Sequence, residues 1–181
     1  MERRKFLKLG LGLGGTALLS PNLFGKSNYH DKVLHLHNVH TGESIKSTFW
    51  QKDDFVVSEL QRLNYFLRDF RSMQVANMDI NLFSLLYAIQ QNMGGTKKPI
   101  DVISGYRSPW TNDFLRKHHH EGVAKKSYHL RAQAIDFNIK DKHLRDTLKI
   151  AKLMELGGVG YYPNSKFIHV DTGPVRTWVG S

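Results

Sequence analysis

Two short stretches decide the interpretation of this chain: Ser127-Tyr128-His129-Leu130-Arg131-Ala132-Gln133-Ala134-Ile135-Asp136 and, further on, Phe167-Ile168-His169-Val170-Asp171. Together they place two imidazoles and one carboxylate at fixed spacings, in a chain that contains no cysteine. Three nitrogen and oxygen ligands that leave a fourth position open are typical of a catalytic zinc, because the open position takes the reacting water. The chain has ten histidines, so a single one means little. The combination predicts one zinc ion per chain, bound by His129, Asp136 and His169.

Both stretches also contain the apolar–polar alternation of a strand. In residues 134–139 the alternation places Asp136 opposite an apolar face, and in residues 167–171 it places His169 and Asp171 on one face. The apolar faces must pack on helices, so the polar side chains are expected to lie together on the other face, at the opening of a cleft. His129 is expected on the loop that leads into the first of these strands.

Helical periodicity surrounds the two strands. Three segments have apolar side chains at three- and four-residue steps, which predicts amphipathic helices: residues 53–70, 82–93 and 141–156. Asp79 is the expected N-cap of the second helix, and Gly94-Gly95 its end. A short strand is predicted at residues 100–104, and Pro109 is expected to begin a further helix.

The chain between residues 33 and 49 predicts a hairpin. Residues 33–40 alternate apolar with polar side chains, Thr41-Gly42-Glu43 resembles a turn, and a second strand is expected at residues 45–49. The histidines at 35, 37 and 40 could form a metal site of their own, but an exposed strand face explains them more simply. Helices combined with strands joined by hairpins or long excursions predict an α+β domain, with a small antiparallel sheet packed against the helices.

Two further side chains are candidates for catalysis. Arg107 lies on a tight turn directly after the predicted strand at 100–104, where it could stabilise the oxyanion formed when an amide is attacked. Asp171 shares a strand face with His169, so it could orient that imidazole or act as a general base. Of these two roles for Asp171, orientation is favoured. A structural ion pair between Arg107 and Asp171 is the alternative for both residues.

The first 25 residues have the layout of an export signal. Arg3 and Arg4 precede Phe6-Leu7-Lys8, a short apolar run follows, and Ser20-Pro21 ends it. The paired arginines resemble a twin-arginine signal, which predicts periplasmic delivery and divides the chain into a signal at 1–25 and a domain at 26–181. The apolar run is too short to span a bilayer comfortably. No Ala-x-Ala cleavage site follows it, so an uncleaved N-terminal anchor remains the alternative.

The excess of basic residues bears on the kind of molecule that the protein binds. The formal net charge is +10, which suits a polyanion, although a basic surface exposed only to solvent is an equally simple explanation. No signature of a nucleic-acid-binding module is present, so an acidic cell-wall polymer is favoured over nucleic acid. Hydrophobic residues make up 40% of the chain and charged residues 23%, which are values of a globular domain.

The central motif resembles a known one. Ser-x-His-x-x-Gly-x-Ala-x-Asp with a later His is the zinc motif of the D-Ala-D-Ala metallopeptidases, whose superfamily includes hedgehog domains. The chain resembles the YcbK-like (murein endopeptidase K) branch of that group. The similarity covers nearly all of the predicted domain, through Asn38–Glu43, Ser104–Pro109, Ser127–Asp136, Gly157–Pro163 and His169–Trp178. It implies zinc ligands at His129, Asp136 and His169, assistance to the transition state from Arg107, and peptidoglycan as the substrate, cut at its peptide crosslinks.

Two positions depart from the motif. Ala132 stands where the family has glycine, in a loop where a positive φ is expected. Lys166 stands where the dipeptidase branch has a catalytic glutamate three residues before its last zinc histidine, which leaves the general base unassigned. The favoured function is a periplasmic zinc endopeptidase of peptidoglycan. A carboxypeptidase that trims D,D or L,D stem-peptide ends and a zinc-retaining wall-binding module without turnover are the alternatives, and the oligomeric state is left open.

Overall fold

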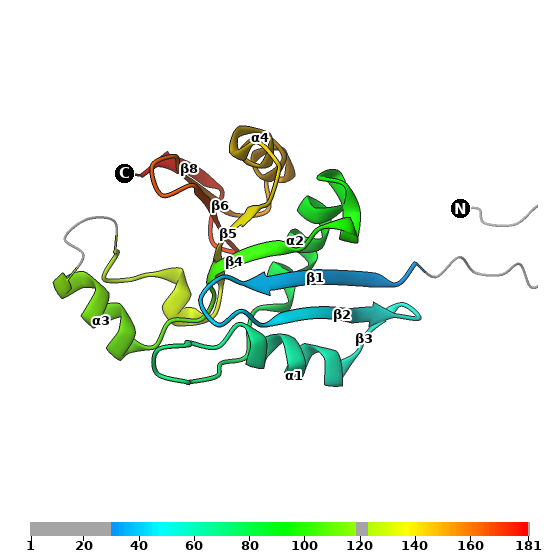
Figure 1. Ribbon diagram of the computed structural model, residues 1–181, viewed down its shortest axis with the longest axis horizontal. Helices are drawn as coiled ribbons and strands as arrows, with labels where there is room; N and C mark the ends of the chain where they lie inside the picture. Colours follow the sequence, from blue (N-terminus) through cyan, green and yellow to red (C-terminus); the bar gives the residue numbers. More distant parts are fainter. Residues whose placement is uncertain (1–29, 119–122, 181) are drawn as a thin grey trace, which may run out of the picture.

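A mixed sheet of eight strands organises the chain (Figure 1). The computed structural model describes residues 30–118 and 123–180. Within these residues the strand order is β3-β2-β1-β4-β5-β7-β6-β8, and helices pack against the sheet. This arrangement confirms the predicted α+β class. The predicted signal at 1–25 lies outside the described residues.

The elements alternate along the chain. The strands are β1 (Lys32–Asn38), β2 (Ser44–Gln51), β3 (Asp54–Phe55), β4 (Ile100–Ser104), β5 (Ala134–Ile139), β6 (Gly158–Tyr162), β7 (Phe167–Asp171) and β8 (Arg176–Val179). The α-helices are α1 (Val57–Phe66), α2 (Ile80–Asn92), α3 (Pro109–His118) and α4 (Leu144–Met154). Short 3-10 helices are η1 (Gly95–Lys97) and η2 (Tyr128–Arg131).

The sheet is larger than the small antiparallel sheet that the sequence predicts, and it is not purely antiparallel. Most neighbouring strands are antiparallel, but β1 pairs with β4 and β6 pairs with β8 in parallel. The β1–β4 pair is parallel because the chain makes a long excursion through α1 and α2 before it returns to the sheet, whereas β6 and β8 are parallel because β7 runs back between them in sequence. Strands β3, β6 and β8 are not predicted; β6 has glycine at 158 and 160 and therefore lacks the usual alternation.

One face of the sheet carries the core. Helix α1 contacts β2, α2 contacts β1, and α4 contacts β5, β6 and β7. The apolar face of the predicted strand at 134–139 is buried as expected, with Ile135 and Phe137 fully inaccessible to solvent. Apolar burial of this kind contributes about 25 cal/mol per Å² and is the main term that holds the sheet and helices together. The polar side chains of the same strands are left for the opposite face.

Local signals set most of the helix ends. The Asp79 carboxylate accepts a hydrogen bond from the Asn81 N–H at 3.0 Å, so the predicted N-cap of α2 is confirmed. Gly94 follows this helix with φ 111°, a conformation that favours glycine. Helix α4 ends earlier than predicted, because Glu155 already adopts a left-handed conformation with φ 50°. Helix α1 stops before residue 70, and the Leu67 carbonyl there accepts a hydrogen bond from Tyr106 N–H at 2.9 Å.

Gly157, between α4 and β6, lies against the backbone at the end of β7, and substituting it tests how tightly the two segments pack. A Cβ atom at this position would collide with the backbone carbonyl of Asp171, which cannot move without displacing β7. We expect Gly157→Ala to lower the free energy of unfolding by about 3 kcal/mol or more, measured by urea denaturation. Gly42→Ala is the control: Gly42 has φ 73° but open space around it, so only about 1 kcal/mol of backbone strain is expected. Equal losses in the two variants would contradict the packing explanation.

Candidate metal centre

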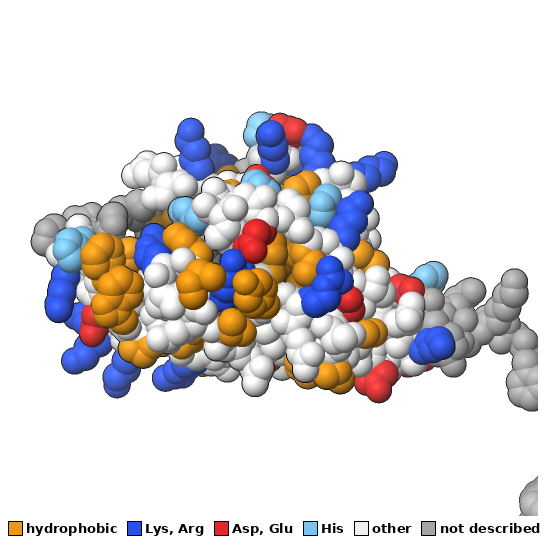
Figure 2. Space-filling model, turned by 60° about the horizontal axis from the view of Figure 1, so that its bottom comes forward, with side chains coloured by type: hydrophobic (Ala, Val, Ile, Leu, Met, Phe, Trp, Pro, Cys, Tyr) orange, Lys and Arg blue, Asp and Glu red, His pale blue; other side chains and the backbone are white. Residues whose placement is uncertain are grey.

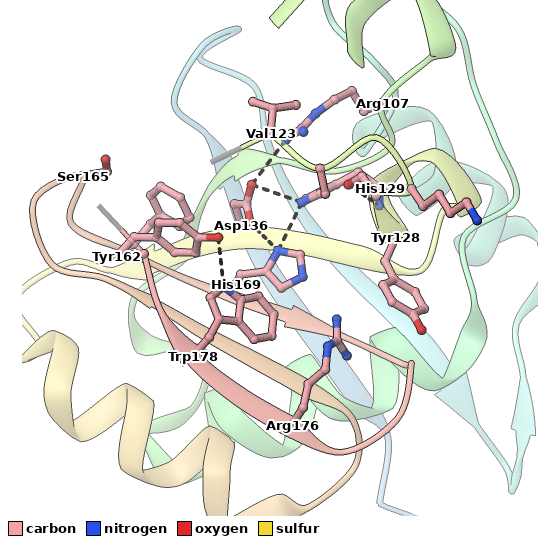
Figure 3. A pocket seen from close by; sticks show the side chains of 15 residues that line it. Arg107, Val123, Tyr128, His129, Asp136, Tyr162, Ser165, His169, Arg176 and Trp178 are labelled. Atoms are coloured by element: carbon pink, nitrogen blue, oxygen red, sulfur yellow. Dashed lines mark hydrogen bonds and ion pairs between the residues drawn. The ribbon is translucent and has the colours of Figure 1, made fainter. Parts of the chain in front are cut away.

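Three predicted ligands converge on the polar face of the sheet (Figure 3). Asp136 on β5 stands opposite His169 on β7 in the strand register, and His129 approaches from η2. His169 Nδ1 lies 2.7 Å from Asp136 Oδ1, His129 Nε2 lies 3.1 Å from Asp136 Oδ2, and the two imidazole nitrogens are 3.2 Å apart. One potential ligand atom from each residue lies within 4.8 Å of the others. Among the described residues, this is the single group with the geometry of a metal site.

Each imidazole is oriented by a hydrogen bond from its other nitrogen. His129 Nδ1 donates to the Gly105 carbonyl at 2.7 Å, which directs Nε2 toward Asp136. His169 Nε2 donates to Asp171 Oδ2 at 3.0 Å, which directs Nδ1 toward the same carboxylate. Imidazoles that bind metals in proteins are usually held in this way, because the second hydrogen bond fixes the ring and its tautomer.

The protonation states follow from burial and from these contacts. Burial lowers the pKa of His129, so this imidazole is neutral and offers a lone pair. Burial alone would raise the pKa of Asp136, but the contacts with His129 and His169 hold it well below its usual range. Burial opposes protonation of His169 as well, yet hydrogen bonds to Asp136 and Asp171 raise its pKa to about 9. The cluster therefore contains an ionised carboxylate between two imidazoles.

Asp171 is fully buried beneath the cluster. Its carboxylate accepts two hydrogen bonds from Arg176, at 2.7 and 3.0 Å, besides the one from His169. The backbone N–H groups of Gly158 and Gly173 also donate to it, at 3.2 and 2.9 Å. Burial opposes ionisation of Asp171, but the hydrogen bonds from His169 and Arg176 keep its pKa well below the usual range. The alternative of an ion pair between Asp171 and Arg107 is wrong, because Arg176 takes that place.

Arg107 instead lies beside Asp136. Its Nη2 is 3.6 Å from Asp136 Oδ2 and 3.2 Å from Ser104 Oγ, and the side chain is almost buried. The backbone of this turn is fixed on both sides of the arginine. Arg107 N–H donates to the His129 carbonyl at 3.2 Å, and Ser108 N–H donates to the Asp69 carboxylate at 2.9 Å. The turn therefore holds a guanidinium at the edge of the three-residue cluster.

A cleft of about 580 Å³ opens over the cluster. Arg107, His129, Asp136 and His169 line it, as do side chains that sequence reasoning did not select, above all Arg176 and Trp178 from β8. These two belong to a stretch that carries the family resemblance, but the strand itself has no strong pattern that would single them out. The Trp178 indole N–H donates to the Tyr162 hydroxyl at 3.0 Å, which fixes this wall of the cleft.

The two departures from the motif have clear local explanations. Ala132 ends η2 with φ 56° and ψ 33°, so the positive φ expected at this position is confirmed, and alanine adopts it with His129 still directed at Asp136. Lys166 is exposed in the turn between β6 and β7 and does not line the cleft. A lysine at this position therefore leaves the cluster unobstructed.

The hairpin histidines are used elsewhere. His37 Nδ1 lies 2.9 Å from the Asp101 carboxylate, and His35 Nδ1 lies 3.1 Å from the Thr96 carbonyl. The His40 ring stacks on Phe70, with ring centroids 4.4 Å apart. These contacts favour the simpler explanation of the polar strand face over a second metal site. Figure 2 shows lysine and arginine side chains dispersed over one face of the molecule, without a single dominant basic patch.

Comparison with known proteins matches nearly the whole chain. The family model described as "Peptidoglycan L,D-endopeptidase MepK" matches residues 26–178. The chain belongs to this family. The Peptidoglycan L,D-endopeptidase MepK of Escherichia coli strain K12 is 47% identical over 178 residues, which cover 98% of this chain and 97% of that protein. The protein of Haemophilus influenzae named "Probable peptidoglycan L,D-endopeptidase MepK" is 45% identical over 180 residues, covering 99% and 96% of the two chains.

Membership of the MepK family confirms the resemblance and the enzyme class inferred from the motif. The chain is a peptidase of the murein endopeptidase branch. The three clustered side chains, Arg107 and Arg176 all lie within the matched region. In the part of the chain that the structure describes, no helix is long and apolar enough to cross a membrane.

Proposed function

We propose that this protein is a periplasmic zinc endopeptidase that hydrolyses L,D amide bonds in peptidoglycan crosslinks. The observation that carries the proposal is the convergence of His129, Asp136 and His169 at the base of a cleft, in a chain of the MepK family. The names of the two relatives, both peptidoglycan L,D-endopeptidases, supply the substrate class. The donor set and its surroundings supply the chemistry.

The three side chains fit a zinc ion. Two imidazole nitrogens and one carboxylate oxygen are a usual ligand set for catalytic zinc, which keeps one position for water or substrate. His129 presents an unprotonated nitrogen, and Asp136 is ionised, as ligands must be. His169 is protonated without a metal, because its pKa is about 9, so zinc binding would displace the proton from its Nδ1. When bound, zinc supplies Lewis-acid polarisation of the scissile carbonyl and activation of water.

Arg107 is the proposed stabiliser of the transition state. Attack on an amide carbon moves negative charge onto the carbonyl oxygen, and a fixed cation beside that oxygen lowers the barrier. The Arg107 guanidinium lines the cleft and lies 3.6 Å from Asp136, so it is next to the ligand cluster without being part of it. The bonds of the Ser104–Pro109 turn to neighbouring segments keep it there before substrate arrives.

Asp171 is proposed to orient His169 rather than to act as the base. Both of its oxygens accept hydrogen bonds, it is fully buried, and it does not line the cleft. A base must reach the attacking water, and a carboxylate beneath the histidine is shielded from it. Asp136 is the one carboxylate among the described lining residues, so we assign no separate general base.

The substrate alternatives differ in what the cleft must accept. A carboxypeptidase would use the same chemistry on the free end of a stem peptide, whereas the relatives are named as endopeptidases. A wall-binding module without turnover would have no use for a buried guanidinium beside the metal ligands. The names of the relatives therefore favour an endopeptidase over a carboxypeptidase, and the buried Arg107 guanidinium favours an enzyme over a binding module.

Export by the twin-arginine route is part of the proposal. The motif Arg3-Arg4 with Phe6-Leu7-Lys8 supports it, and a peptidoglycan substrate requires a location outside the cytoplasm. These residues lie outside the described part of the structure, so the sequence pattern alone supports this route.

The decisive experiment is digestion of intact sacculi, followed by muropeptide analysis. We expect the purified protein to release products of L,D crosslink cleavage, a chelator to abolish the activity, and zinc to restore it. Arg107→Ala should retain zinc but lose about 100- to 1,000-fold in kcat, because its contribution arises as charge develops on the oxygen. Arg116→Ala, which removes an exposed arginine from α3, is the control for a change in net charge. Native turnover in Arg107→Ala would exclude the proposed role.

Asp171→Asn separates orientation from base catalysis. If Asp171 orients His169, the substitution should weaken zinc binding by about 10- to 100-fold, as measured by competition with a chromogenic chelator. A general base would instead leave zinc affinity intact while the rate falls by about 100-fold or more. Thermal unfolding of the same variant controls for damage to the fold. Native zinc affinity together with native turnover would remove Asp171 from the site.

The export route is testable in cells. Replacing Arg3 and Arg4 together by lysine preserves the charge, yet should stop delivery to the periplasm, because the twin-arginine machinery requires the arginine pair. Fractionation followed by immunoblotting gives the measurement. Normal periplasmic arrival of this double variant would indicate the general secretory route.

A further inference from the structure

Arg176 is a fixed cation in the wall of the cleft that the proposed reaction does not yet use. It begins β8, and its side chain points toward the same space as His169 and Tyr128 (Figure 3). The side chain is 39% exposed, whereas its partner Asp171 is fully buried. An arginine needed only to neutralise Asp171 could be buried with it, but this one presents an accessible guanidinium to the cleft.

The guanidinium is held on several sides. Asp171 accepts two hydrogen bonds from it, and the Pro174 carbonyl accepts a third at 3.0 Å. The rings of Tyr128 and Trp178 flank it, each with its centroid 4.9 Å from the guanidinium carbon. A side chain fixed in this way loses little conformational entropy when it binds a ligand, which favours tight and directional binding.

The guanidinium retains capacity for a ligand. Arginine has five N–H donors, and the three hydrogen bonds to Asp171 and Pro174 use three of them, which leaves two without a partner among the described residues. The described lining residues include the cations Arg107, Lys126 and Arg176 but a single carboxylate, Asp136. Bound zinc would add further positive charge. The cleft therefore favours an anionic group, and a planar guanidinium suits a carboxylate.

We infer that Arg176 binds a free carboxylate of the peptide substrate, carried by the D-configured residue next to the scissile amide. The inference rests on the proposed function, because an L,D crosslink supplies a D-configured residue on one side of the bond. Arg107 is less suited to this task, since its nearly buried side chain is already directed at Asp136. Lys126 is exposed and offers only a flexible point charge.

The first test uses the unmodified zinc-loaded protein and two synthetic peptides. Each contains one L,D amide bond between stem-peptide residues, and they differ only in whether the D-configured residue carries a free carboxylate or a primary carboxamide. We expect KM for the carboxylate peptide to be about 10- to 100-fold lower, with similar kcat, because a charge-assisted hydrogen bond is made in both ground and transition states. Equal KM values would overturn the inference without any variant.

The second test asks whether Arg176 causes the preference. With zinc at saturating concentration, Arg176→Gln should abolish the preference, so that the ratio of the two KM values falls by about 10- to 100-fold, whereas any effect transmitted through Asp171 would change both peptides alike. Arg131→Gln is the matched control, because Arg131 also lies over the Tyr128 ring, at 5.3 Å, but does not line the cleft. It removes the same charge and should preserve the preference. Loss of the preference in both variants would overturn the assignment to Arg176.

Zinc affinity separates this role from a purely structural one. If Arg176 served only to hold Asp171, Arg176→Gln would weaken zinc binding and slow both peptides equally, and that outcome would contradict the inference. Arg176→Lys, which keeps a positive charge beside Asp171, should show an intermediate preference and gives the comparison if the glutamine variant is poorly folded.

Failure of the proposed endopeptidase function can be told apart from failure of the inference about Arg176. If the zinc-loaded protein cleaves neither peptide nor sacculi, the carboxylate-binding role of Arg176 can still be tested. Isothermal titration calorimetry then measures the affinity of the protein for each intact peptide. Tighter binding of the carboxylate peptide that disappears in Arg176→Gln would support the carboxylate site. Equal binding of both peptides would overturn it.

Discussion

The pairing of Asp136 with His169 across strands β5 and β7 is the contact on which the site depends. The two residues are opposite in the strand register, and their side chains meet at 2.7 Å on the face away from the helices. A shift of one residue in this register would turn both polar groups into the core and their apolar neighbours into the cleft. The buried apolar side chains on the other face, such as Ile135 and Val170, therefore fix the geometry of the polar ones.

Burial of so many ionisable groups is unfavourable unless each finds partners. Here each buried ionisable group is compensated by the next group in a chain of contacts. Asp136 contacts both imidazoles and Arg107, His169 donates to Asp171, and Asp171 is in turn satisfied by Arg176 and backbone N–H groups. A cation in the cleft is thus connected through one carboxylate to a proposed metal ligand. The same network that stabilises the charges restricts the orientation of the residues that would do chemistry.

Much of the site could be predicted because its residues lie on strongly patterned strands. Alternation alone indicated that Asp136 projects opposite an apolar face, and that His169 and Asp171 share a face; the structure brings all three together with His129. The partner of Asp171 could not be found in this way. The sequence offered Arg107 as an alternative partner without any pattern to support it, whereas the chain turns back after β7 and brings Arg176 to the carboxylate.

The missed strands have physical reasons as well. Strand β6 contains two glycines, and Gly160 lies so close to the Trp178 ring that a Cβ atom would overlap it. Such a segment is specified by what packs on it rather than by its own pattern. Strand β3 has two residues, fewer than any periodicity can reveal. The parallel pairing of β1 with β4 depends on where the long excursion through α1 and α2 ends, which local sequence does not encode.

The distribution of the site along the chain has a consequence for how this protein can change. Every described residue of the cluster and its cleft comes from positions 104–180. The β1–β2 hairpin, α1 and α2 contribute no lining residue and only support the sheet. Among the described residues, the hydrogen bonds between this supporting half and the Arg107 turn are accepted by the Leu67 carbonyl and the Asp69 carboxylate. Asp79 adds bonds to Ala132 and Thr172, which flank the cluster in sequence. Substitutions away from these three contact residues can alter how long the folded molecule survives without altering what it cuts. New specificities are therefore accessible through the second half, on a scaffold that can drift independently.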